Sequence, residues 1–203
     1  MPFTNNQRYT RVAIWLHWLI ALLVLGLMAS GIWMTDAVEE AGSQKLALQI
    51  YQLHKSFGLI ILALTLVRLI WRFVHRPPEF VADMPRWERV AARIIQWLFY
   101  VLMIGLPVTG WLMVSASPIG LPTLFFGELN VPHYPAFSAL DYGELELWES
   151  RFSEIHEYVA YGGIALIVLH SSAALRHHFL LADDTLRRML PAMKPRDEAG
   201  KEQ

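Results

Sequence analysis

Residues 94–114 read IIQWLFYVLMIGLPVTGWLMV, and none of these side chains is charged. An α-helix needs about 20 mostly apolar residues to cross the hydrocarbon core of a bilayer. Three further segments meet this requirement, and together they predict an all-α, integral membrane four-helix bundle that forms a single domain over residues 1–203. The expected membrane helices are residues 12–34, 50–74, 94–114 and 155–175, with a long outer loop over residues 115–154.

The composition of the 203-residue chain agrees with a membrane protein and excludes several kinds of function. Hydrophobic residues make up 55% of the chain and charged residues 17%, against roughly 45–50% and 25% in soluble domains. The net charge of −1 gives no bulk attraction to nucleic acid. The absence of cysteine excludes disulfides, iron–sulfur clusters and covalently attached c-type haem, and it leaves eight histidines as the strongest metal ligands.

The distribution of lysine and arginine predicts the orientation of the bundle in the membrane. Fourteen of the 17 basic residues fall in the two terminal segments, in the loop between the second and third helices, and at the helix ends beside them. The loops on the other side, with the adjacent helix end, contain only Lys45, Lys55 and Arg151. The positive-inside rule therefore places both termini in the cytoplasm.

Four histidines lie in the expected membrane helices, and they divide by depth into two pairs. His54 and His156 lie at the outer ends of their helices, whereas His17 and His170 lie nearer the inner ends. The 14 residues from His156 to His170 correspond to about 21 Å and almost four helical turns, so both side chains lie on one helix face. Ionisable side chains are costly inside a membrane and usually have a function there.

Two histidines that face each other at one depth suit a planar cofactor with opposed axial positions, and haem ligated by two imidazoles is the leading candidate. We expect two non-covalent b-type haems, an outer one on His54 and His156 and an inner one on His17 and His170. A single histidine in this setting would more often only bond to a neighbouring helix, but the pairing of four favours ligation. Three glycines on these helices would give a macrocycle room: Gly31, Gly58 and Gly163.

Short motifs around these histidines resemble the bacterial cytochrome b-561 family, and their order and helix placement make the resemblance specific. It covers about residues 8–191, and it implies a four-helix protein of the bacterial inner membrane that binds two b-type haems through His17, His54, His156 and His170 and passes electrons. The motifs are Trp15-Leu16-His17-Trp18, His54-Lys55-Ser56-Phe57-Gly58, Ile155-His156-Glu157, Leu169-His170, His177-His178 and Asp184-Thr185-Leu186-Arg187-Arg188-Met189-Leu190-Pro191.

Electron transfer across a membrane needs a redox partner at each end of the bundle. We expect membrane quinone, such as ubiquinone, at one end and an unknown periplasmic donor or acceptor at the other. One member of the family is a superoxide oxidase that feeds electrons to ubiquinone, which makes superoxide a candidate donor. The outer loop is larger here than in that shorter form, over residues 118–142, and this difference leaves the superoxide activity open.

Two further residues are candidates for cofactor binding at the inner end. Arg68 lies 14 residues after His54, at the level of the inner haem, where its guanidinium would pair with a propionate; the alternative is an arginine that snorkels to the interface. His177 lies seven residues after His170, about 10 Å nearer the cytoplasm. There it would handle the protons of a quinone bound between the first and fourth helices, although interfacial histidines often only anchor a helix.

Two other functions remain as alternatives. The chain could be a haem-bearing membrane anchor subunit for a periplasmic oxidoreductase, with the outer loop as its docking surface; co-purification of a second protein would favour this reading. A divalent-metal transporter is the weaker alternative, because such cations prefer mixed histidine and carboxylate sites. The interior of the four expected helices contains no acidic residue.

Overall fold

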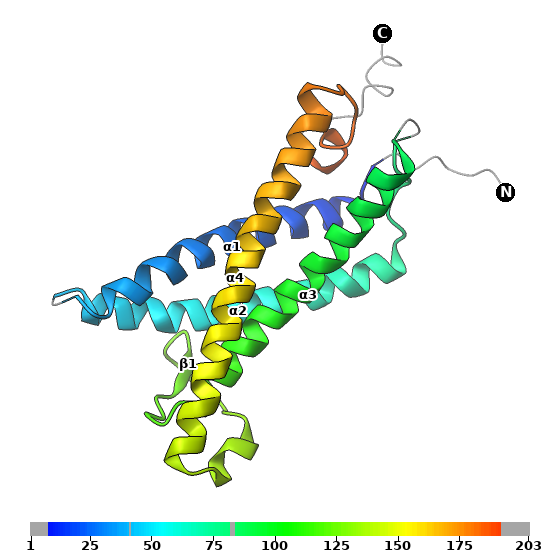
Figure 1. The fold of residues 1–203 in the computed structure, drawn as a ribbon. Coiled ribbons are helices and arrows are strands. Elements are labelled where there is room, and N and C mark those ends of the chain that lie inside the picture. Colours follow the sequence, from blue (N-terminus) through cyan, green and yellow to red (C-terminus); the bar gives the residue numbers. More distant parts are fainter. Residues whose placement is uncertain (1–7, 41, 82–83, 192–203) are drawn as a thin grey trace.

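Four long α-helices dominate the computed structural model, and all four are long and apolar enough to cross a membrane (Figure 1). This confirms the predicted all-α membrane bundle. α1 packs beside α2, α2 against α3, and α3 beside α4. The structure describes residues 8–40, 42–81 and 84–191. The helices are α1 (Arg11–Ala37), α2 (Gln44–Val74), α3 (Arg86–Ala116) and α4 (Tyr142–Phe179).

The two described ends of the chain meet at one end of the bundle, which we call the basic end. Arg8 donates hydrogen bonds to the carbonyl groups of Leu190 and Pro191. The indole nitrogen of Trp18 donates to the carbonyl of Met189 over 2.6 Å. The segment after α4, which includes the short 3-10 helix η2 (Arg187–Met189), is therefore held against the start of α1.

The opposite end, which we call the loop end, differs from the expected long loop over residues 115–154. That expectation is wrong in its second half, because α4 begins at Tyr142. The Asp141 carboxylate accepts a hydrogen bond from the Glu144 backbone N–H at 2.8 Å, and the Glu144 carboxylate accepts one from the Asp141 N–H at 3.1 Å. This capping box starts a helix outside the apolar span, where hydropathy gives no signal.

The rest of the loop folds into a β-hairpin and a 3-10 helix, η1 (Pro135–Ala139). In the hairpin β1 (Thr123–Phe125) pairs antiparallel with β2 (Leu129–Val131). The hairpin is fixed to α2 through Ser56, whose hydroxyl accepts a hydrogen bond from the Phe126 N–H at 2.9 Å. Ser56 follows His54 by two residues on α2, so the hairpin is attached at the level of one of the four histidines, on another face of the helix.

Candidate functional site

The inner histidine pair consists of one residue from the first long helix and one from the last. The ring centres of His17 on α1 and His170 on α4 are 6.2 Å apart, with the ring planes at 73°. A metal–imidazole bond is about 2 Å long and the ring centre lies about 1 Å beyond the nitrogen, so two imidazoles on opposite sides of one metal have centres roughly 6 Å apart. The two side chains are thus spaced as a single iron would require.

The outer pair, His54 on α2 and His156 on α4, interacts electrostatically, and each ring has a hydroxyl partner. The Nδ1 atom of His54 lies 3.3 Å from the Ser30 hydroxyl, and that of His156 lies 3.1 Å from the Thr109 hydroxyl. Each hydroxyl donates its own proton to carbonyls of its own helix, with contacts at Leu27 for Ser30 and at Gly105 and Leu106 for Thr109.

A hydroxyl that has donated its one proton can only accept from an imidazole. This arrangement suits outer histidines that carry their proton on Nδ1 and leave the unprotonated Nε2 available as a metal ligand. Partners of this kind fix the tautomer and the orientation of a ligating histidine. Thr109 lies on α3, which has no histidine in its apolar span, and for this reason the sequence patterns gave no signal for it.

Glycines let two of the helices approach the outer imidazoles closely. A Cβ atom at Gly31 would lie 3.3 Å from Cε1 of His54, and one at Gly110 would lie 3.2 Å from Cε1 of His156. Gly31 was expected to give a macrocycle room, and in the structure its neighbour is the His54 imidazole. At Gly163 the Cβ atom would lie 3.0 Å from the Met28 methyl group, whereas Gly58 has no neighbour within 4 Å.

Replacement of Gly110 with alanine tests the fit around His156. The substitution favours the helix itself by about 1 kcal/mol, so the fold should persist. The added methyl group must nevertheless displace the imidazole, and we expect a shifted absorption band and midpoint potential for one haem only. Gly105→Ala is the matched control on the same helix, because a Cβ there meets nothing within 4 Å. Identical redox titrations for the two variants would contradict this account.

Arg68 lies close enough to both inner histidines to act on them electrostatically. Its neighbour Arg72 donates a hydrogen bond to Gln96 at 2.7 Å, whereas Arg68 has no hydrogen bond or ion pair within the described part of the chain.

Tyr9, which the sequence patterns missed, lies near both arginines. Burial raises the pKa of the Tyr9 hydroxyl although Arg72 and Arg68 act to lower it, so the hydroxyl stays protonated and can donate to an anion.

His177 is buried in a cluster of charged side chains at the basic end. Its Nδ1 atom lies 2.6 Å from Asp183 and its Nε2 atom 3.6 Å from Glu88 on α3. Glu88 also accepts a hydrogen bond from Arg176 at 3.1 Å. The ring is thus held between α3 and the segment after α4, whereas the sequence led us to expect it beside a quinone bound between the first and fourth helices. We call Glu88, Arg176, His177 and Asp183 the carboxylate–histidine cluster.

The charge of Asp183 is fixed by its neighbours in this cluster. Partial burial raises the pKa of Asp183, but the hydrogen bonds from His177 and Thr185 outweigh that effect and leave the pKa below its usual value. A lowered pKa means that the carboxylate stabilises the fold above about pH 4, the unfolded value, and that this contribution disappears as the pH falls through the folded value. At neutral pH Asp183 is therefore an anion that holds the His177 ring.

These features define a class: a membrane bundle in which histidines of different helices approach each other, with the ring centres of the inner pair 6.2 Å apart. The family model of prokaryotic cytochrome b561 matches residues 8–192, and the chain belongs to this family. It is a bacterial multi-pass membrane protein that binds b-type haem and transfers electrons in the membrane.

Curated relatives match nearly the whole length of the chain. Cytochrome b561 homolog 2 of Escherichia coli is 33% identical over 192 residues, which cover 94% of this chain and 95% of the relative. Cytochrome b562 of Cereibacter sphaeroides is 32% identical and covers 95% and 99% of the two chains. A probable superoxide oxidase of Yersinia pestis is 28% identical and covers 92% and 97%.

Proposed function

We propose that this chain carries electrons across the bacterial inner membrane through two b-type haems. His17 and His170 would hold the inner haem, and His54 and His156 the outer one. The observation that carries the proposal is the 6.2 Å separation of the inner imidazoles. When bound, each haem supplies a one-electron redox centre whose potential depends on its ligands, its hydrogen bonds and its burial.

The protein would tune each centre with different groups. Around the outer pair, the Ser30 and Thr109 hydroxyls orient the imidazoles and set their tautomer. Near the inner pair, the positive charge of Arg68 and the protonated Tyr9 hydroxyl suit the carboxylates of a b-type haem. The two histidine levels on α4 are about 21 Å apart, which divides the membrane crossing into shorter electron transfers.

Membrane quinone is the proposed partner at the basic end, which the positive-inside rule places in the cytoplasm. Quinone chemistry couples electrons to protons and needs a group that can take up and release protons. His177, in contact with Glu88 and Asp183, is the proposed proton carrier.

At the loop end the proposed partner is a periplasmic donor or acceptor. Superoxide is one candidate, supported by the name of the Yersinia relative.

A second candidate function is a haem-bearing anchor for a periplasmic oxidoreductase. Its support is the folded structure at the loop end, where α4 lines an open hollow of about 550 Å³. The lining is mostly apolar, with Trp148 and Phe152, and also includes Arg151 and Glu154. A stable partner protein that co-purifies from native membranes and depends on Trp148 would favour this function. Recovery of an active chain without a partner favours the self-contained carrier.

The haem content of the purified protein tests the main proposal. We expect two b-type haems per chain by haem extraction and chain quantification, and a reduced-minus-oxidised spectrum with two components of different midpoint potential. A soluble quinol analogue should reduce both components. A content of one haem per chain, or a spectrum that quinol does not change, would contradict the proposal.

A further inference from the structure

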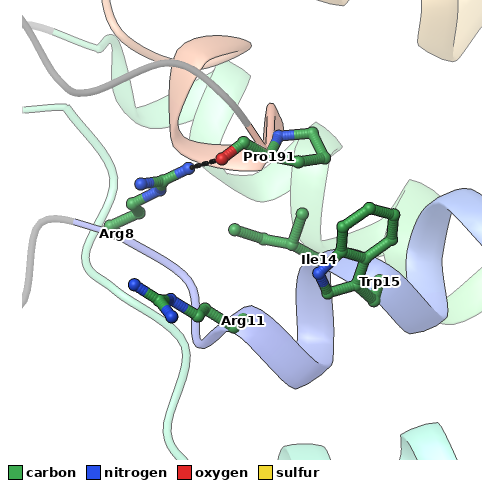
Figure 2. A pocket seen from close by; sticks show the side chains of 5 residues that line it. All are labelled: Arg8, Arg11, Ile14, Trp15 and Pro191. Atoms are coloured by element: carbon green, nitrogen blue, oxygen red, sulfur yellow. Dashed lines mark hydrogen bonds between the residues drawn. The ribbon is translucent and has the colours of Figure 1, made fainter.

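A pocket at the basic end of α1 has the chemistry of an anion site (Figure 2). Its volume is about 240 Å³, comparable to that of about eight water molecules. Two of its walls are arginines, Arg8 and Arg11, and none of the described residues that line it is acidic. The remaining walls are Ile14, Trp15 and Pro191.

Both arginines retain donors for a ligand. Arg8 donates through one terminal nitrogen to the Leu190 and Pro191 carbonyls, but its buried Nε atom has no hydrogen-bond partner among the residues that the structure describes. Arg11 is exposed and is the first residue of α1, so the positive end of the helix dipole adds to the two guanidinium charges. Because Arg8 and Arg11 are both permanently positive, the pocket favours an anion over a neutral carbonyl compound.

The pocket opens where the membrane surface is expected. Trp15 is 63% exposed, and the apolar side chains of Val12 and Leu19 beside it on α1 are also exposed. Tryptophan is enriched at the level of the lipid headgroups, and exposed apolar side chains on a spanning helix face the acyl chains. A ligand bound here would therefore have a phosphate at the arginines and a hydrocarbon part along α1.

We propose that this pocket binds the phosphate headgroup of an anionic phospholipid from the leaflet at the basic end. The phosphodiester would accept hydrogen bonds from Arg8 and Arg11, and the acyl chains would lie against Trp15 and Leu19. Because Arg8 also binds the segment after α4, the lipid would brace the contact between the two ends of the chain. This role is separate from electron transfer and does not depend on it.

Lipid retention by the purified haem-loaded protein tests the proposal. The probe is phosphatidylglycerol in phosphatidylcholine nanodiscs, and native mass spectrometry counts the lipids that stay bound. We expect Arg11→Gln and Arg8→Gln each to weaken retention of phosphatidylglycerol about fivefold, as a basic residue at an anionic surface would. Arg86→Gln is the matched control, because Arg86 is also an exposed first residue of a helix but lies outside the pocket.

The outcomes separate a specific lipid site from its alternatives. An equal loss of retention for Arg86→Gln and Arg11→Gln would mean diffuse surface electrostatics and would overturn the proposal. Displacement of the lipid by millimolar inorganic phosphate would show a site for free phosphate instead. Unchanged haem spectra in all variants would establish that they are folded, and unchanged retention in the folded pocket variants would also overturn the proposal.

Discussion

Replacement of His170 with alanine is expected to leave the purified protein with about half of its haem. The inner ring pair would lose the imidazole that α4 supplies, and His17 alone provides one axial ligand and no opposed partner. His54 and His156 lie about 21 Å away along the bundle and keep their hydroxyl partners. The outer haem should therefore remain, with its absorption and midpoint potential unchanged.

The measurement is haem extraction per chain combined with a redox titration. His178→Ala is the control, since His178 lies on the same helix and faces none of the four histidines. That variant should retain the full haem content. A His170→Ala protein with both spectral components intact would remove His170 from the ligand set, and loss of both haems in a correctly folded protein would show that the two levels are not independent.

Replacement of His177 with alanine or glutamine is expected to slow electron exchange with a soluble quinone analogue by about 100-fold, the range in which a positioned acid–base group contributes. Glutamine can still bond to Asp183 but cannot titrate near neutral pH. A purely structural role for the ring would be rescued by glutamine and not by alanine. A role in proton transfer would be lost in both, while both haem spectra stay normal.

The readout is the rate of haem reduction by quinol as a function of pH. The wild-type rate should change with pH, and the His177→Gln variant should show a weaker change. Glu88→Gln is a useful companion variant, because it keeps the size of the side chain and removes its charge. Wild-type kinetics in the glutamine variant of His177 would place the proton carrier elsewhere.

The sequence predicted the four spans and the shared helix face of His156 and His170 because both follow from features of single helices. Hydropathy identifies an apolar span, and a 14-residue interval on one helix fixes a shared face whatever the neighbours are. The polar ends of the helices were not predicted by hydropathy. α4 starts with Asp141 and Glu144 as a capping box, and α3 starts directly after Pro85.

The parts of the site that the sequence did not predict depend on how the helices are rotated against one another. Thr109 and Gly110 contact His156 only because α3 presents that face to α4. The surroundings of His177 were misjudged for a related reason. Glu88 lies before residue 94, where the third helix was expected to begin, and so its position on α3 opposite His177 was not anticipated.

The length of α4 has a mechanical consequence. Its 38 residues extend for about 57 Å, whereas the hydrocarbon core of a bilayer is about 30 Å thick. One unbroken helix therefore extends beyond the hydrocarbon core, and it carries Trp148, His156 and His170 in this order along its axis. A protein that pressed on the outer turns would tilt the whole helix. Such a tilt would displace His156 and His170 together. The outer surface of the protein is therefore mechanically coupled to both candidate metal positions.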